Sequence, residues 1–193
     1  MNPMFYFLLA LTAVLAETAN AGTPILDSDG NPVLGNASYY VRSREGGGLA
    51  LNPFGVNICP LYVGLERSAD NDGIPVKFSD WKSGDEFVPE DEPLNIEMDV
   101  KDTLCFEPTY WRISTTPVVP VTSLISTGPK PFTGQFRIRR SERFYRRICG
   151  AISGAIIDRN DCTDVGLSVD DLGLSRLALN APSTFDVEFK KVP

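Results

Sequence analysis

Histidine is absent from all 193 residues of the sequence, which removes the side chain that most often acts as a general acid or base. Ser-His-Asp and Cys-His mechanisms are therefore excluded. Metal sites built on imidazole are excluded for the same reason. No other group of residue types forms a catalytic pattern, so the sequence predicts a protein that is not an enzyme and holds no cofactor or metal.

Positive charge is also in short supply, since 18 Lys and Arg stand against 25 Asp and Glu, for a formal net charge of −7. An acidic chain of this kind is a poor partner for nucleic acid and for anionic surfaces. Beyond the N-terminus, no apolar run approaches the length of a transmembrane helix. We therefore expect neither a nucleic-acid partner nor a membrane partner.

The N-terminal residues 1–21 (MNPMFYFLLALTAVLAETANA) form an apolar run that is too short to span a bilayer. The run ends in Ala19-Asn20-Ala21, whose small residues match a signal-peptidase site. A buried core helix is the alternative, and the Ala-x-Ala ending argues against it. We expect residues 1–21 to be a signal peptide and residues 22–193 to be one secreted domain, extracellular or vacuolar by way of the secretory pathway.

Cysteine is scarce, and its four occurrences all fall in the part expected to be secreted: Cys59, Cys105, Cys149 and Cys162. An even number of cysteines in an exported chain predicts disulfides, here with three alternative pairings. No pair has the Cys-x-x-Cys spacing of common zinc sites. Two disulfides are expected, and the spacing alone leaves their connectivity open.

Sustained helical periodicity is missing too, and short alternating or β-branched runs recur between Gly and Pro residues. Twelve candidate strands result: 39–42, 49–52, 61–66, 75–79, 94–99, 110–115, 121–126, 135–140, 144–149, 165–170, 175–180 and 184–191. They divide into three groups of four that begin at similar intervals, which suggests internal repetition. An all-β fold is therefore predicted, as a β-trefoil of three four-stranded units or, alternatively, a β-sandwich.

Several short motifs, spread in order over residues 22–193, together resemble one known family. They include 25–33 (ILDSDGNPV), 39–41 (YYV), 59–61 (CPL), 73–78 (GIPVKF), 110–113 (YWRI) and 185–189 (FDVEF). On these motifs the sequence is identified as a member of the plant Kunitz inhibitors of the soybean trypsin inhibitor type, a family that includes miraculin-like and non-inhibitory members. The resemblance implies a β-trefoil fold and disulfides Cys59–Cys105 and Cys149–Cys162.

The resemblance also implies the position of an inhibitory loop, here residues 79–88, after the fourth strand. Inhibitors of this family present the loop to a serine protease, which binds it as a substrate but cleaves and releases it very slowly. Ungapped counting from Gly73 places Ser83 at the residue that enters the specificity pocket, and Lys82 precedes it. Because trypsin-directed members carry Lys or Arg there, Lys82–Ser83 is the candidate reactive bond.

Acidic residues surround Lys82, and we expect them to draw its side chain away from a protease pocket and so weaken trypsin inhibition. Trp81 and Phe87 are alternative anchors for a chymotrypsin-like, subtilisin-like or non-serine protease. The same two aromatic side chains could instead pack back onto the fold. A lysine in an acidic loop is also often an ordinary surface residue.

Family inhibitors brace this loop with an Asn side chain that precedes the strand starting at Tyr39. The ungapped position is Gly35, so Asn36 is the bracing candidate after a shift of one residue. Bracing matters because a loop that must become ordered on binding loses affinity. Asn36-Ala37-Ser38 is also an N-glycosylation sequon, and a glycan on Asn36 would compete with the bracing role.

Two basic features remain outside this loop. Arg159 lies between Cys149 and Cys162 and is a candidate for a second inhibitory loop, although a plain surface hairpin is the alternative. Six arginines lie between residues 135 and 149. They form either a patch for an anionic partner or an exterior that pairs with nearby carboxylates.

The sequence thus predicts a monomeric, secreted protease inhibitor that acts on serine endopeptidases by substrate-like insertion of residues 79–88. Its expected partner is a protease, with a foreign digestive enzyme as one candidate. A non-inhibitory trefoil binding or storage protein of the miraculin-like kind is the alternative from a different class. A third hypothesis is inhibition of a cysteine or aspartic protease through another loop.

Overall fold

The structure, a computed structural model, describes residues 22–115, 123–141, 145–151 and 162–193. All regular structure in these ranges is β-sheet, and no helix long and apolar enough to cross a membrane is found in them. The thirteen strands are β1 (Tyr39–Ser43), β2 (Leu49–Phe54), β3 (Asn57–Leu65), β4 (Val76–Ser79), β5 (Asn95–Met98), β6 (Tyr110–Thr115), β7 (Ser123–Gly128), β8 (Phe136–Arg140), β9 (Arg146–Gly150), β10 (Thr163–Val169), β11 (Ser175–Leu179), β12 (Ser183–Thr184) and β13 (Asp186–Lys191).

Each of the twelve predicted segments contains a strand, but the last predicted segment, 184–191, is divided between two. Thr184 pairs with Gly166 on β10, whereas Asp186 pairs with Arg147 on β9. The chain changes neighbours at Phe185, which is fully buried between the two strands. The described residues therefore contain thirteen strands instead of twelve. The last segment is divided because its two halves pair with different strands, which the local sequence pattern does not indicate.

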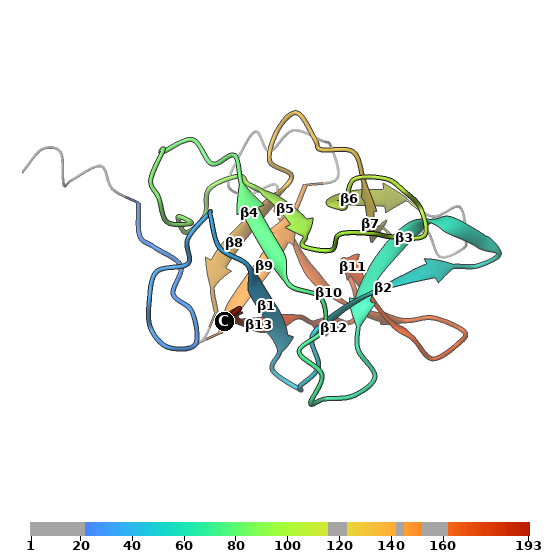
Figure 1. The fold of residues 1–193 in the computed structure, drawn as a ribbon. Coiled ribbons are helices and arrows are strands. Elements are labelled where there is room, and N and C mark those ends of the chain that lie inside the picture. Colours follow the sequence, from blue (N-terminus) through green and yellow to red (C-terminus); the bar gives the residue numbers. More distant parts are fainter. Residues whose placement is uncertain (1–21, 116–122, 142–144, 152–161) are drawn as a thin grey trace, which may run out of the picture.

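Ten of these strands form a closed ring (Figure 1). Successive neighbours in the ring are β10, β11, β3, β7, β6, β5, β4, β1, β13 and β9, and β9 pairs back with β10. The other three strands lie outside the ring, where β2 pairs with β3, β8 with β9 and β12 with β10. Closure leaves the ring without free edges that could pair with another chain.

The core fills the space enclosed by the strands, because alternate side chains of each strand turn inward. Phe78 of β4 and Phe189 of β13 meet edge to face, with ring centroids 5.4 Å apart. Trp111 and Phe136 meet in the same way at 5.6 Å. Such aromatic pairs add to the free energy of burial and hold β4 and its neighbours in fixed positions.

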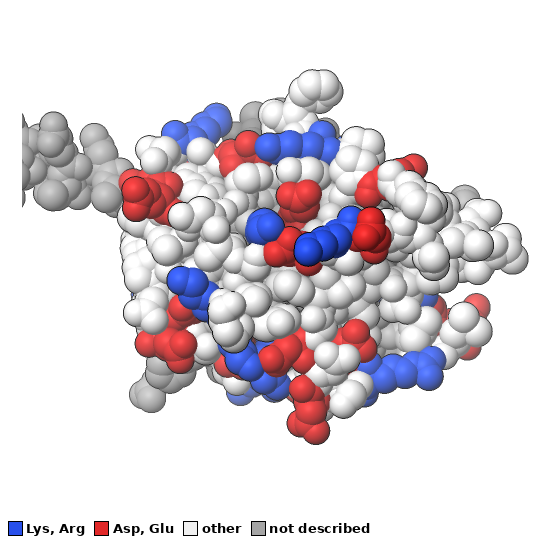
Figure 2. All heavy atoms as spheres, viewed as in Figure 1, with Lys and Arg blue, Asp and Glu red and all other residues white. Residues whose placement is uncertain are grey.

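The outer surface mixes charges of both signs. Figure 2 shows Lys and Arg side chains lying beside Asp and Glu on the face in view. Three pairs from well-separated parts of the sequence are Arg42–Asp72, Lys77–Asp99 and Lys190–Asp72. Local pairing of this kind balances positive and negative charge between neighbouring side chains.

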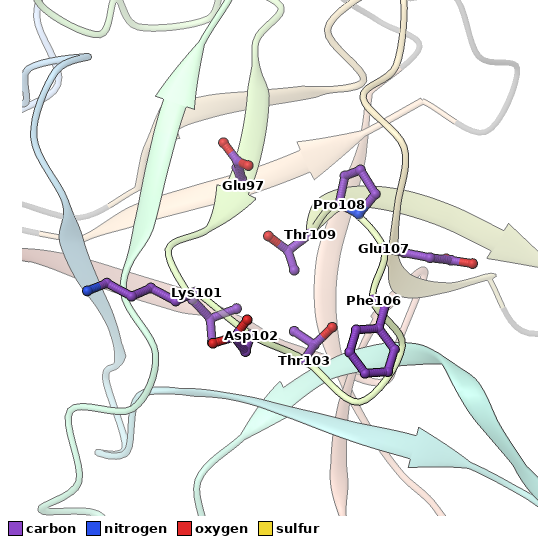
Figure 3. Close-up of a pocket in the computed structure, with 9 residues that line it drawn as sticks. Glu97, Lys101, Asp102, Thr103, Phe106, Glu107, Pro108 and Thr109 are labelled. Carbon is purple, nitrogen blue, oxygen red and sulfur yellow. The ribbon is translucent and has the colours of Figure 1, made fainter.

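A shallow pocket lies between Glu97 and the loop after β5 (Figure 3). Its wall includes Asp102, Glu107 and Phe106, whose ring is 95% exposed. The three carboxylates of Glu97, Asp102 and Glu107 point in different directions. Within the described ranges, no group of three or more His, Cys, Asp or Glu is arranged to hold a metal ion.

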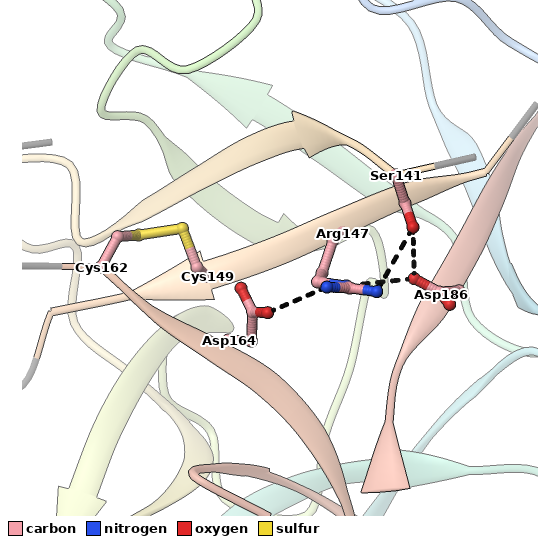
Figure 4. Close-up of polar contacts among 6 residues, drawn as sticks. All are labelled: Ser141, Arg147, Cys149, Cys162, Asp164 and Asp186. Atoms are coloured by element: carbon pink, nitrogen blue, oxygen red, sulfur yellow. Dashed lines mark hydrogen bonds and ion pairs between the residues drawn. A yellow bond between two sulfur atoms is a disulfide. The ribbon is translucent and has the colours of Figure 1, made fainter. Parts of the chain in front are cut away.

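Arg147 on β9 contacts acidic residues on both neighbouring strands of the ring, β10 and β13 (Figure 4). Its guanidinium contacts Asp164 of β10 at 3.3 Å and Asp186 of β13 at 3.2 Å. The Ser141 hydroxyl donates a further hydrogen bond to Asp186 at 2.9 Å. The hydrogen bond to Asp186 raises the pKa of Arg147, so the guanidinium stays charged and bridges three strands at the point of closure.

The structure confirms the two disulfides implied by the family resemblance. Cys59 of β3 is bonded to Cys105 in the loop after β5, with a sequence separation of 46. Cys149 of β9 is bonded to Cys162 just before β10, with a separation of 13. The first bond lies at an exposed end of the molecule, whereas Cys149 is buried at the ring closure.

Replacing Cys59 and Cys105 by alanine should destabilise the protein more than replacing Cys149 and Cys162. In the chain-entropy model the two bonds contribute about 4 and about 3 kcal/mol, because the longer loop restricts the unfolded chain more. Denaturant unfolding of both double variants measures the difference. An equal or greater loss for the Cys149–Cys162 pair would show that packing of the buried Cys149 outweighs loop length.

Arg176 on β11 is a charged side chain in the interior, only 1% exposed. Its Nε donates to the Asp170 carboxylate at 3.0 Å. Its two terminal nitrogens donate to the carbonyls of Asn52 at 3.1 Å and Pro53 at 2.8 Å. One guanidinium thus fixes β2 against β11, and the attached carboxylate neutralises its charge.

Asp170→Asn should lower the free energy of unfolding by about 3–5 kcal/mol, because it leaves Arg176 buried without its counter-charge. Asp171→Asn is the matched control, since it changes an adjacent acidic residue that is exposed. Thermal or denaturant unfolding at neutral pH separates the two variants. A similar loss in both would contradict the role assigned to Asp170.

The same pair predicts how stability depends on pH. Burial acts to raise the pKa of Asp170, but hydrogen bonds from the Leu174 amide and from Arg176 outweigh it, so the pKa is lowered. A lowered pKa gives stability that is present above the unfolded-state value, about 4, and is lost as pH falls through the folded value. The wild-type free energy of unfolding should therefore fall more steeply below pH 4 than that of Asp170→Asn. Parallel curves would contradict this.

Candidate functional site

Residues 79–88, the predicted inhibitory loop, leave β4 and lie beside the N-terminal segment of the fold (Figure 1). The Ile25 amide donates to the Val88 carbonyl at 2.9 Å. Phe87 forms an isolated antiparallel bridge with Leu34, which leaves its side chain half-buried. The returning arm of the loop is thus held as an extended segment against the first residues of the fold.

Asp80 fixes the start of the loop. Its backbone has a φ of 70°, a left-handed conformation that is uncommon outside glycine. The carboxylate accepts a hydrogen bond from Asn95 at 2.8 Å and pairs with Lys130 at 2.8 Å. Partial burial acts to raise the pKa of Asp80, but the bonds from Lys130 and Asn95 outweigh it and the pKa is lowered. The carboxylate therefore remains charged and keeps the turn in place.

Trp81 turns into the loop and is half-buried. Its indole Nε1–H donates to the Asp85 carbonyl at 2.8 Å, which connects two points of the loop. The ring packs against the hydrophobic core and lies directly over Gly35. The structure thus agrees with the alternative in which Trp81 packs back onto the fold.

The family's bracing position is Gly35, and the indole ring uses the space that a side chain there would need. A Cβ on Gly35 would lie 2.3 Å from the Cη2 atom of Trp81, far inside contact distance. Asn36 is exposed, and within the described ranges no hydrogen bond joins it to the loop. Trp81 therefore braces the loop where Asn36 was expected to do so. Glycosylation of Asn36 stays a prediction, compatible with its exposure.

Lys82 and Ser83, the candidate reactive pair, are both exposed. Their backbone amides donate to the same carboxylate oxygen, Oε2 of Glu92, at 3.1 and 3.2 Å. Glu92 lies in the segment that leads from the loop to β5. The N–H of the Lys82–Ser83 peptide bond and the N–H of the preceding peptide bond are therefore both held from the base of the loop, while the two residues are exposed.

Three of the acidic residues around the loop, Asp80, Glu90 and Asp91, form ion pairs with residues outside it. Within the part of the chain that the structure describes, no carboxylate pairs with the Lys82 ammonium. The expectation that acidic neighbours draw this side chain away from a protease pocket stays a prediction. The pairs that use these carboxylates are Asp80–Lys130, Glu90–Arg140, Asp91–Arg137 and Asp91–Arg139.

These pairs also bear on whether the six arginines of residues 135–149 form a patch for an anionic partner or pair with nearby carboxylates. Arg137 and Arg139 on β8 hold Asp91, and Arg140 holds Glu90, so three of the six support the segment that follows the loop. The pairing agrees with the hypothesis of arginines that pair with nearby carboxylates, but Arg137 and Arg146 are buried and do not belong to an exterior surface. Arg143 and Arg159 lie outside the described residues.

Sequence reasoning missed two of the groups that hold the loop. Glu92 belongs to the acidic run 90–92 (EDE), which is typical of a solvated surface, and only its spatial position shows that it accepts two loop amides. The bracing role of Trp81 was also missed. The sequence did contain a signal for it. A glycine at the family's Asn position leaves a space, and a tryptophan in the loop has a side chain large enough to fill that space.

A closed β-sheet with two disulfides, from which a loop held by an indole hydrogen bond projects, defines a rigid scaffold that presents loops. The chain belongs to the legume Kunitz family of trypsin and protease inhibitors, whose sequence profile matches residues 25–191. The family is described as one of trypsin and protease inhibitors, and this chain is not an enzyme.

Individual relatives span nearly the whole chain. Kunitz trypsin inhibitor 4 of Arabidopsis thaliana is 41% identical over 208 aligned positions, which cover 99% of this chain and 92% of the relative. The solved complex of porcine pancreatic trypsin with soybean trypsin inhibitor contains a similar chain, with a TM-score of 0.74 and 25% identity over 89% of this chain and 100% of that one. A type II water-soluble chlorophyll-binding protein shares the fold, with a TM-score of 0.73 and 22% identity over 89% and 99% of the two chains.

Gly35→Ala should loosen the loop, because the added methyl group collides with the Trp81 ring at a cost of about 1–3 kcal/mol. We expect faster cleavage within residues 79–88 by excess subtilisin, measured by mass spectrometry during timed digestion. Asn36→Ala is the control and should leave the rate unchanged, when both proteins are made without glycans. Faster cleavage of Asn36→Ala alone would restore Asn36 as the brace.

Proposed function

We propose that this protein is a secreted inhibitor of serine endopeptidases, which it binds through residues 79–88. The observation that carries the proposal is the exposed Lys82–Ser83 bond, whose amides are held by Glu92 while Trp81 supports the loop from within. A loop that is already ordered binds without a further loss of conformational entropy. The names of the trypsin-inhibiting relatives support the same activity.

In this proposal the Lys82 ammonium enters the specificity pocket of a trypsin-like enzyme and pairs with the acidic group there. The protease serine attacks the Lys82 carbonyl carbon, the bond to the Ser83 nitrogen breaks, and that nitrogen takes up a proton to become an amine. Glu92 accepts a hydrogen bond from the Ser83 nitrogen before cleavage, at 3.2 Å. A carboxylate in this position would keep the new amine close to the acyl-enzyme, which favours re-formation of the bond over hydrolysis.

We propose three further properties of the same protein. The strands are arranged as the three four-stranded units of a β-trefoil, which the twelve predicted segments and the family support. Residues 1–21 are removed as a signal peptide and the remainder is exported or delivered to the vacuole. The mature chain works as a monomer, because a substrate-like loop needs only one copy to fill a protease active site.

A non-inhibitory binding function is the second candidate. The observation in its favour is Gly35, since this chain lacks the Asn brace of typical family inhibitors. The chlorophyll-binding structural neighbour shows that the fold alone does not determine what a member binds. Titration of the purified protein against trypsin, chymotrypsin and subtilisin separates the two functions, because a binding protein would leave all three enzymes fully active.

Lys82→Ala should weaken binding to trypsin by about 2–5 kcal/mol, because it removes a charge that pairs with a buried carboxylate in the specificity pocket. Lys101→Ala, which changes an exposed lysine in the loop after β5, is the matched control and should bind like the wild type. The inhibition constants of the three proteins measure the effect. Tight binding that survives Lys82→Ala would reject this reactive bond and direct attention to Arg159.

A further inference from the structure

Gly22, the first described residue, lies against the base of the inhibitory loop. A Cβ placed on it would be 3.8 Å from Oε1 of Glu92 and 3.9 Å from Oδ2 of Asp85. The following residue is fixed in place, since the Thr23 carbonyl accepts a hydrogen bond from the Glu90 amide at 2.7 Å. The backbone of Gly22 is therefore held within a few ångströms of two carboxylates that belong to the loop and its base.

These two carboxylates have no cationic partner in the described ranges of the chain. Oδ2 of Asp85 is buried without any hydrogen-bond partner, an unfavourable state for a carboxylate oxygen. Glu92 uses Oε2 for the amides of Lys82 and Ser83, and its Oε1 faces Gly22. The arrangement lacks one positive charge at the position of the Gly22 backbone.

We propose that cleavage after Ala21 supplies this charge, so that the new α-ammonium group of Gly22 pairs with Asp85 and Glu92 and locks the inhibitory loop. The inference rests on the signal-peptide cleavage included in the proposed function. Cleavage adds water across the Ala21–Gly22 peptide bond, which leaves a carboxylate on Ala21 and an amine on Gly22. In the precursor the same nitrogen is an uncharged amide and cannot neutralise the site.

The residue type at position 22 fits this role. A Cβ there would meet the Cβ of Pro89 at 3.1 Å, closer than side chains normally approach, so glycine brings the terminus nearest to the loop. Glu92 then links the terminus to the candidate reactive bond, with the ammonium on one oxygen and the amides of Lys82 and Ser83 on the other. Processing would thus add one more constraint on the loop in the mature protein.

The test uses the full chain secreted from a eukaryotic host that processes signal peptides. Mass spectrometry should find Gly22 as the first residue, and any other first residue overturns the proposal. The pKa of the α-amino group, followed by pH-dependent labelling or by NMR, should be about one unit above its ordinary 7.7–8.0. Asp85→Asn should lower this pKa toward the ordinary value, whereas Glu86→Gln, which removes an exposed carboxylate from the same loop, should not.

A second measurement covers the case in which Asp85→Asn fails to fold. Selective acetylation of Gly22 in the wild-type protein should speed cleavage within residues 79–88 by subtilisin about tenfold at pH 7, the factor that one pKa unit represents. The difference should vanish as pH rises through the raised pKa, because the α-amino group of the unmodified protein is then neutral, as is the amide of the acetylated form. Equal rates at pH 7, or an α-amino pKa at its ordinary value, would overturn the ion pair. Neither readout requires inhibition, so a protein that inhibits no protease could still show the ion pair.

Discussion

The pairing of β9 with β10 closes the sheet, and the rest of the molecule depends on that closure. The two strands share a short register, in which Gly150 faces Thr163 and Cys149 faces Asp164. So few ladder contacts give modest stability, and the Arg147 bridge and the second disulfide lie at this same place. Once the ring is closed, its interior is filled by one continuous core, and the connecting loops can vary without exposing sheet edges.

Residues 79–88, the candidate inhibitory loop, take their rigidity from this ring. The loop connects β4 to β5, which pair in register from Val76 opposite Met98 to Ser79 opposite Asn95. Asn95, the last residue of that ladder, also donates to Asp80, so the hydrogen-bonded wall continues into the first turn of the loop. The indole of Trp81 then fills the interior of the loop and rests on the core. The buried strands thus hold the first turn of the loop, and the core holds Trp81 inside it. The side chains of Lys82 and Ser83 at the tip are exposed.

Much of the fold could be predicted from the sequence, because the β-branched alternation and the Gly and Pro punctuation are local signals. All twelve segments contain strands, yet the division at Phe185 could not be foreseen, since it arises where the chain changes neighbours. The disulfide pairing came from the family resemblance, because spacing alone leaves the partners open. In the site, the position of the loop could be predicted, whereas the direction of Trp81 could not. That direction depends on the missing side chain of Gly35, a residue that only the folded chain brings next to it.

The way in which the loop is held also bears on how strongly it can bind. A protease that takes an extended segment as a substrate forms hydrogen bonds with its main chain, and these bonds contribute to affinity. The amide of Lys82 already donates to Glu92, so a protease acceptor must replace that bond before it gains one. This exchange adds less binding free energy than a wholly new hydrogen bond would. The bond to the Glu92 carboxylate that must first be broken contributes about 1.5–3 kcal/mol, as hydrogen bonds to charged groups do. If residues 79–88 bind a protease as proposed, Glu92 would favour re-formation of the cleaved bond and would also oppose docking of the uncleaved one. This opposition is a reason to expect weak trypsin inhibition that does not depend on an acidic partner for the Lys82 side chain.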